Sequence, residues 1–113
     1  YTTSNLVCYT GTHDNYTLKG WLQTLKKSEL EYIKLYLGVQ KKRQIPDAMI
    51  RLAFSSCADT AIVQIQDLLG SEPSARMNTP STLGTNWKFR IAADDLNKDV
   101  ILKLKFLNKI FNR

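Results

Sequence analysis

The residues with the clearest chemical potential lie in the stretch YTGTHDNYT at positions 9–17, which sets the chain's single histidine beside an aspartate. A neutral His13 donates one hydrogen bond and Asp14 accepts two, so the adjacent pair can hold neighbouring hydroxyl groups of one sugar. A carboxylate also stabilises positive charge that develops in a transition state. Spacing alone leaves a second interpretation open, because Asp is a common N-cap of a following helix.

The pair follows a short apolar run and precedes a helical pattern. Residues 5–9 (NLVCY) are nearly all apolar, which is typical of a β-strand covered on both faces. Gly11 breaks this run, and apolar residues then recur at helical spacing from about Thr17 to Leu25, with Trp21 on the buried stripe. Loops after the carboxyl ends of strands form the active sites of α/β folds. The pair therefore occupies a loop of the kind that carries catalytic residues.

Two helices and a second strand are predicted before residue 70. The stretch SELE at 28–31 is typical of a capping box that opens a helix ending at Gly38. Pro46 favours the first turn of another helix, which runs to about Ala58, and residues 61–65 (AIVQI) predict a second buried strand. The residues expected to face inward from these helices are Leu30, Ile33, Leu37, Met49, Ile50, Ala53, Phe54 and Cys57.

A long segment and a last helix complete the pattern. Residues 71–90 are rich in Ser, Thr, Asn, Pro and Gly, and so long a loop in a compact fold is usually functional or disordered. Four side chains that can anchor it favour an ordered functional loop: Met77, Leu83, Trp87 and Phe89. A helix is predicted from about Asn97 to Phe111. Its expected buried residues are Val100, Ile101, Leu104, Leu107 and Phe111.

The order strand, helices, strand, long loop, helix predicts an α/β fold with parallel strands. Two strands make a poor sheet by themselves, because their edges and faces need partners. We therefore expect part of an α/β fold rather than a whole one. The first residue is not Met, which agrees with a piece of a longer chain.

Composition narrows the function classes. The net charge of +6 invites nucleic-acid or anionic-membrane binding, but the basic residues lie at predicted helix ends, in loops and along the last helix, so solvated surface is favoured. No apolar run approaches the roughly 20 residues that cross a bilayer, and the first residues do not resemble a signal peptide. Cys8 and Cys57 form no metal-binding motif and predict buried thiols in a reducing, cytoplasmic compartment.

Several blocks of the chain together resemble one enzyme family. YTGTHDN at 9–15 and TLKGW at 17–21, followed by the blocks 45–59, 61–70 and ARMNTPSTLGTNWKFR at 75–90, resemble the amylomaltases, which are bacterial 4-alpha-glucanotransferases. The blocks stand in family order over nearly the whole chain. The resemblance implies an α/β fold formed by the last two strand-helix units of a (β/α)8 TIM barrel. The 113 residues are then expected to be the C-terminal segment of an incomplete catalytic domain.

The resemblance implies transfer of an α-1,4-glucan segment, with retention, through a covalent glycosyl-enzyme. Retention needs one carboxylate as nucleophile and another as acid/base, and no acid of this chain matches either motif. By resemblance, Asp14 is the family's third carboxylate and His13 its partner, both contacting the 2- and 3-hydroxyls of the sugar at the cleaved bond. These contacts are expected to tighten in the transition state. We therefore expect the chain alone to be inactive.

The resemblance also implies that the long loop lines the glucan cleft, with Asn78 and Asn86 as amide ligands of sugar hydroxyls. For Trp87 two roles stay open on equal terms: stacking on a sugar face, and anchoring of the core or the loop. Gln66 is expected to end the second strand at the site, where it binds substrate or instead caps a helix or fixes a loop. The neighbouring Asp67 has the same alternatives. Arg76 is expected to hold the loop through backbone carbonyls or Asp67.

Four positions depart from the family pattern. The family often has Asp, Pro, Gly and Trp where this chain has Tyr16, Gln64, Ser81 and Phe89. The expected partners are α-1,4-glucans, maltooligosaccharides and the remainder of the barrel, with no nucleic acid, membrane, metal or cofactor. Two other functions stay open: a non-catalytic glucan-binding module and a small basic nucleic-acid-binding domain.

Overall fold

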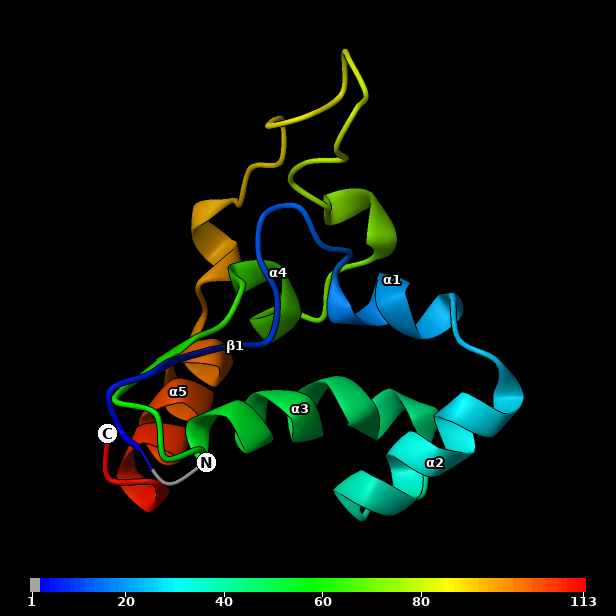
Figure 1. The fold of residues 1–113 in the computed structure, drawn as a ribbon. Coiled ribbons are helices and arrows are strands. Elements are labelled where there is room, and N and C mark those ends of the chain that lie inside the picture. Colours follow the sequence, from blue (N-terminus) through cyan, green and yellow to red (C-terminus); the bar gives the residue numbers. More distant parts are fainter. Residues whose placement is uncertain (1–2) are drawn as a thin grey trace.

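A computed structural model describes residues 3–113 of the chain. The strands are β1 (Val7–Tyr9) and β2 (Thr60–Ile62), and the helices are α1 (Leu18–Gln23), α2 (Lys27–Leu37), α3 (Ile45–Phe54), α4 (Ile65–Leu68) and α5 (Lys98–Ile110). Single turns of 3-10 helix lie at Lys42–Gln44, Pro73–Ala75 and Ala93–Asp95. In Figure 1 the segment around residue 80, in yellow, projects away from the helices. The element order confirms the predicted α/β class.

The two strands form a short parallel sheet. Val7 pairs with Thr60, Cys8 with Ala61 and Tyr9 with Ile62. On one face of this sheet, Val7, Tyr9 and Ile62 are 43–53% exposed, so the expectation of strands covered on both faces is wrong for this chain. The sheet formed by residues 3–113 has two strands, and the described residues leave about half of each of these three side chains uncovered.

The second strand is shorter than predicted. It ends at Ile62, and Ile65 begins α4, with Gln64 at the N-cap position of that helix. Gln66 and Asp67 therefore lie in a helical turn rather than at the end of a strand. The side chain of Ile65 packs against the core from this turn. The apolar run predicted as one strand is therefore divided between the strand β2 and the helix α4.

The core lies where α1, α3, α4 and α5 meet, and it consists of Leu18, Ile50, Phe54, Leu68 and Leu107. Met49, Leu104 and Phe111 pack against it, as expected. Ile101 is exposed, so its predicted burial is wrong. It lies about 100° around α5 from the buried Val100, on the flank of the apolar stripe.

Two helix ends differ from the predicted ones. Helix α2 begins at Lys27, and the Glu29 carboxylate accepts the backbone N–H of Lys26 at 2.7 Å, so the capping box predicted at Ser28 is wrong. Gly38 ends α2 in the left-handed conformation, as predicted. Helix α3 stops at Phe54 rather than near Ala58. The guanidinium of Arg113 donates to the carbonyl of Phe54 at 2.7 Å and so satisfies one of the acceptors left at that helix end.

The cysteines differ from the predicted buried thiols. Cys8 is half-buried, and Cys57 is exposed, with its sulfur 3.4 Å from the carbonyl oxygen of Thr3. Because α3 ends before Cys57, that side chain does not face the core. The compartment inferred from buried thiols loses its support. Within residues 3–113, no helix has both the length and the apolar composition that membrane crossing requires.

Asp67 joins α4 to the start of α1. Its Oδ1 accepts the backbone N–H of Leu18 at 2.7 Å, while the hydroxyl of Thr17 accepts that of Gly20 at 3.1 Å. The side chain is buried, and its Oδ2 has no hydrogen-bond partner among the described residues. Burial raises the pKa of the Asp67 carboxyl above its usual value, and the bond from Leu18 opposes this. Of the roles open to Asp67, the structure shows the capping one.

The raised pKa of Asp67 has a consequence for stability. A folded-state pKa above the unfolded value means that the folded chain binds more protons, so the contribution of Asp67 to stability falls as pH rises through this range. Asp67→Asn keeps the acceptor for Leu18 and removes the charge. We expect the variant to match or exceed the parent in melting temperature at neutral pH, with a difference that shrinks toward about pH 4. A parent that gains stability over the variant with rising pH would contradict this.

Candidate functional site

The loop after β1 is a tight turn that presents His13 and Asp14. The side-chain oxygen of Asn15 accepts the backbone N–H of Thr12 at 2.6 Å and its hydroxyl at 2.9 Å, which closes the turn. At Gly11, a Cβ would lie 2.6 Å from Nε2 of Gln64, so a larger residue here would require the end of the Gln64 side chain to move. The loops that follow β1 and β2 therefore lie close together at the carboxyl edge of the sheet.

His13 and Asp14 meet each other and remain open to solvent. Nε2 of His13 lies 3.3 Å from Oδ2 of Asp14, and the two side chains are 54% and 44% exposed. Asp14 is not the cap of α1, because Thr17 holds that position and the Asp67 carboxylate accepts the next N–H. The alternative interpretation of Asp14, as the N-cap of the following helix, is therefore wrong. Its carboxylate is available for another role.

Asn78 connects the long loop to this pair. Its side-chain Nδ2 donates to Oδ1 of Asp14 at 2.6 Å, and its backbone N–H donates to the carbonyl of His13 at 3.0 Å. Each carboxylate oxygen of Asp14 thus faces one nitrogen, from Asn78 or from His13. The carboxylate is oriented on both sides before any ligand is present.

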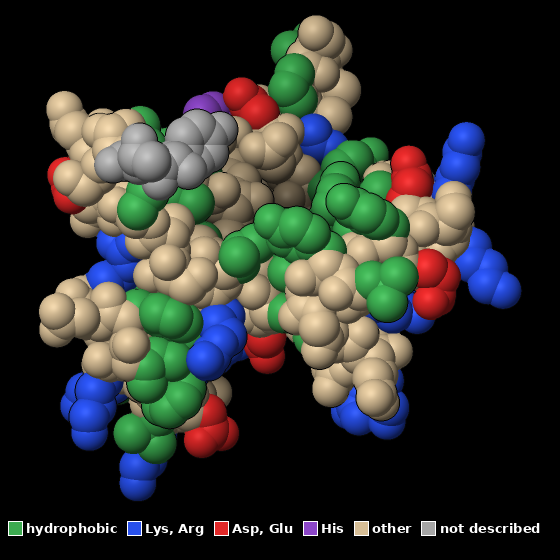
Figure 2. All heavy atoms as spheres, turned by 60° about the horizontal axis from the view of Figure 1, so that its bottom comes forward, with side chains coloured by type: hydrophobic (Ala, Val, Ile, Leu, Met, Phe, Trp, Pro, Cys, Tyr) green, Lys and Arg blue, Asp and Glu red, His purple; other side chains and the backbone are tan. Residues whose placement is uncertain are grey.

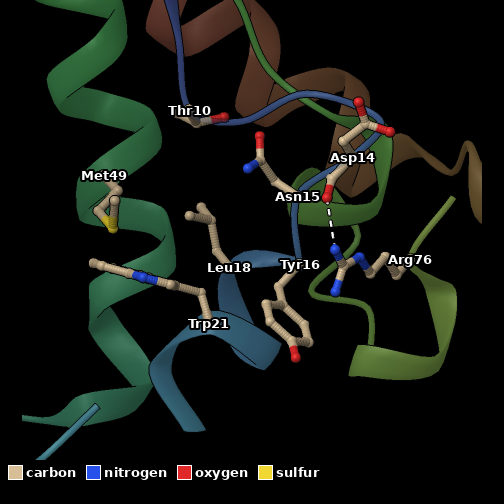
Figure 3. A pocket seen from close by; sticks show the side chains of 8 residues that line it. All are labelled: Thr10, Asp14, Asn15, Tyr16, Leu18, Trp21, Met49 and Arg76. Atoms are coloured by element: carbon tan, nitrogen blue, oxygen red, sulfur yellow. Dashed lines mark hydrogen bonds between the residues drawn. The ribbon is translucent and has the colours of Figure 1, made fainter. Parts of the chain in front are cut away.

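Arg76 links the same two segments through their backbones. Its Nη2 donates to the carbonyl of Asp14 at 2.7 Å, shown by the dashed line in Figure 3, and its Nε donates to the carbonyl of Asn78 at 3.0 Å. The guanidinium carbon lies 4.2 Å from the ring centroid of Tyr16, a cation–π contact. The prediction that Arg76 holds the loop through backbone carbonyls is confirmed. The role of Tyr16 was not predicted, since no sequence spacing relates two residues so far apart.

The other predicted site residues have different surroundings. The amide of Asn86 is used inside the loop, where it accepts the Thr79 N–H at 2.9 Å and donates to the carbonyl of Thr82 at 3.0 Å. Gln66 is 4% exposed and donates to the carbonyl of Ala75 at 3.3 Å, which favours loop fixing over sugar contact. Leu83 is 98% exposed, so its predicted role as a loop anchor is wrong.

Trp87 comes close to the pair. Its ring centroid lies 5.1 Å from that of His13, with the ring planes at 34°. The structure thus brings together His13, Asp14, Asn78 and Trp87. Gln66 and Asn86 instead form hydrogen bonds with the backbone of the long loop. Contacts of any of these side chains with a sugar stay predictions.

A cavity of about 440 Å³ opens beside Asp14. Figure 3 shows its two sides, one polar and one apolar. The polar side includes Asp14, Asn15 and Arg76, and the apolar side consists of Leu18, Trp21 and Met49. Trp21, predicted as a core residue, is half-buried and lines this cavity. No group of three or more potential metal ligands occurs within residues 3–113.

Comparisons with known proteins show which family this α/β segment resembles. Residues 1–96 match the sequence profile of the 4-alpha-glucanotransferases. The chain is 44% identical over 111 residues to the chloroplastic/amyloplastic 4-alpha-glucanotransferase of Oryza sativa subsp. japonica, which covers 95% of this chain and 18% of the relative. It is 40% identical over 113 residues to the 4-alpha-glucanotransferase of Synechocystis, covering 100% of this chain and 22% of the relative.

A solved structure shares the fold. The amylomaltase from Streptococcus agalactiae, in complex with acarbose, matches with a TM-score of 0.92 at 33% identity, over 98% of this chain and 22% of that chain. The chain therefore belongs to the 4-alpha-glucanotransferase family, as the sequence blocks indicated. It spans between 18% and 22% of the length of these three proteins.

The linking role of Arg76 predicts a local effect. Arg76→Ala removes both hydrogen bonds to the backbone, so the amide of Asn78 should exchange with solvent faster by about tenfold. Arg76→Lys should not restore protection, because an ammonium lacks the planar fork that reaches two carbonyls. Arg90→Ala is the matched control, since Arg90 bonds only carbonyls within its own turn. Unchanged exchange at Asn78 in the alanine variant would refute the linking role.

Proposed function

We propose that this chain is the part of a 4-alpha-glucanotransferase that grips the sugar at the exchanged bond. The observation that carries the proposal is the state of Asp14, whose carboxylate is oriented by Asn78 and His13 and yet is 44% exposed. A carboxylate with a purely structural role is expected to have both oxygens occupied by protein donors or to be buried. This one keeps acceptor capacity directed outward, as a ligand-binding group must.

The chemistry follows from this arrangement. Glycosyl transfer passes through a transition state with oxocarbenium character, in which the sugar ring flattens and becomes positive. A fixed carboxylate beside the ring stabilises that charge and accepts hydrogen bonds from ring hydroxyls, and His13 adds a second polar contact. Because Asn78 holds Asp14 in place beforehand, little reorganisation is needed when the charge develops.

The bond-making and bond-breaking carboxylates are proposed to come from outside these residues. Three acids of the chain are engaged elsewhere: Asp47 pairs with Lys103, Glu72 pairs with Lys19 at 2.7 Å, and Asp67 caps α1. A retaining mechanism needs two carboxyl groups about 5–5.5 Å apart across the scissile bond. Asp14, with its amide and imidazole partners, is suited to the supporting role rather than to either of these.

The finer fold belongs to the same proposal. The parallel pairing of β1 and β2, connected through α1, α2 and α3, supports assignment to the last two strand-helix units of a (β/α)8 barrel. The exposed Val7, Tyr9 and Ile62 would then point into the barrel interior, which in this architecture is filled by side chains. The missing barrel strands would cover both free edges of the sheet.

The substrate class is proposed to be α-1,4-glucans and maltooligosaccharides. The matched Streptococcus amylomaltase is in complex with acarbose, which supports a saccharide ligand for the shared fold. A nucleic-acid-binding function has less support, because the Lys and Arg side chains on the face shown in Figure 2 lie in separate groups and form no single patch there.

Asp14→Asn in the full-length enzyme that contains this chain tests the proposal. The substitution preserves size and removes the charge, so transfer from maltotriose should fall by about 10²–10³-fold in kcat, the usual cost of losing one transition-state contact. The melting temperature should change little, since Asp14 is half exposed. Asp47→Asn, at an exposed ion pair with Lys103, is the matched control and should keep parental turnover. Near-parental turnover in Asp14→Asn would overturn the assigned role.

The isolated 113-residue chain is expected to be inactive. Incubation with maltotriose should yield neither glucose nor longer maltooligosaccharides, because no nucleophile or acid/base is proposed within it. Measurable disproportionation would contradict this expectation. Saccharide binding by the isolated chain would favour the alternative of a non-catalytic glucan-binding module only if the full-length enzyme were also inactive.

A further inference from the structure

The contact between Trp87 and His13 suggests a role beyond sugar binding. The indole lies against the imidazole with ring centroids 5.1 Å apart and planes tilted by 34°, within the range of favourable aromatic pairs. Trp87 is 55% exposed, so burial of its own surface does not account for its position. One part of the indole surface is already occupied by a functional side chain.

The backbone at Trp87 is strained. Its φ angle is 61°, in the left-handed region that a bulky residue enters at a cost of roughly 1–2 kcal/mol. The backbone N–H of Trp87 donates to the carbonyl of Met77 at 2.7 Å, which ties this residue to the first part of the long loop. Strain of this kind persists where the surrounding structure imposes it, often at functional sites. A glycine would adopt this backbone freely and would lose the indole.

We propose that Trp87 is a positioning residue that holds the His13 ring in the orientation where Nε2 faces Asp14, an inference that rests on the function proposed above. His13 is 54% exposed and has no hydrogen bond to its Nδ1 from residues 3–113, so its ring has few other restraints. Packing of the indole on the imidazole restricts its rotation. Nε2 then stays 3.3 Å from Oδ2 of Asp14, and Nδ1 is left for a sugar hydroxyl.

The three contacts from the long loop divide the work. Asn78 fixes Oδ1 of Asp14, Arg76 fixes the backbone carbonyl of Asp14, and Trp87 fixes the ring of His13. The loop that follows β1 supplies the sugar-binding groups, and the long loop supplies their orientation. Under this assignment the indole contributes to catalysis through His13 and not by stacking on the substrate.

A double-mutant cycle in the full-length enzyme separates the two roles. The four proteins are the parent, Trp87→Leu, His13→Ala and the double variant, each assayed for transfer from maltotriose. We expect Trp87→Leu to lower kcat by roughly tenfold with little change in KM, and to cost less than about twofold in the His13→Ala background. Equal losses in both backgrounds, accompanied by a raised KM, would overturn the inference and assign Trp87 to sugar stacking.

Two further variants exclude a simple loop effect. Trp87→Gly suits the left-handed backbone and lacks the ring, so positioning predicts the same loss of kcat as in Trp87→Leu, whereas parental kcat would overturn the inference. Leu83→Ala is the control, since Leu83 is 98% exposed in the same loop, and it should keep parental kcat. Parental kcat in His13→Ala would overturn both the sugar-gripping role of His13 and this inference. Additive losses, with His13→Ala impaired, would overturn the inference alone.

Discussion

The hydrogen bonds from Arg76 and Asn78 to Asp14 are the constraint on which the site depends. They join segments that are 62 and 64 positions apart in the sequence, and they act on both the backbone and the side chain of one residue. Bringing two such distant segments together costs conformational entropy, and the pairing of the two strands offsets part of that cost. The parallel pairing of β1 and β2 places the two strand ends side by side, so the loops that follow need only a few further contacts.

The rest of the fold serves this meeting point. Asp67 ties the turn after β2 to the first turn of α1, and Gln66 ties the same turn to Ala75, just before the functional part of the long loop. The core under these turns contains Leu18 and Leu68, one from each side. The Gln64 side chain, from the loop after β2, lies close to Gly11 in the loop after β1. Positions that the resemblance assigned to substrate, such as Gln66 and Asn86, therefore have a clear structural use in shaping the loop.

Much of the fold could be predicted from the sequence, and the errors have identifiable physical causes. Helices α3 and α5 and the stop at Gly38 follow from local periodicity and backbone preference, which act within a few residues. Ile65 was assigned to a strand because a short apolar run fits either a strand or a buried helical turn, and only packing decides. Burial of both sheet faces was predicted from the apolar residues of the strands. Such residues indicate that a face has to be covered, but they do not show which segment covers it.

The site was predictable in part for the same reason. His13 and Asp14 are adjacent in the sequence and follow a strand, so their proximity at the sheet edge could be inferred directly. Their orientation depends on Asn78 and Trp87, and spacing carries no information about contacts between distant loops. Tyr16 illustrates this limit, because its ring gains a meaning only when Arg76 lies over it at 4.2 Å.

Two departures from the family pattern can now be explained in physical terms. Ser81 stands where the family often has Gly and has a φ of 62°, so the backbone keeps the conformation that glycine adopts freely while paying a steric cost. Tyr16 stands where the family often has Asp, and its ring meets the Arg76 guanidinium where a carboxylate would form an ion pair. The arrangement around Asp14 depends on the position of the Arg76 guanidinium, and in this chain an aromatic ring supports that position.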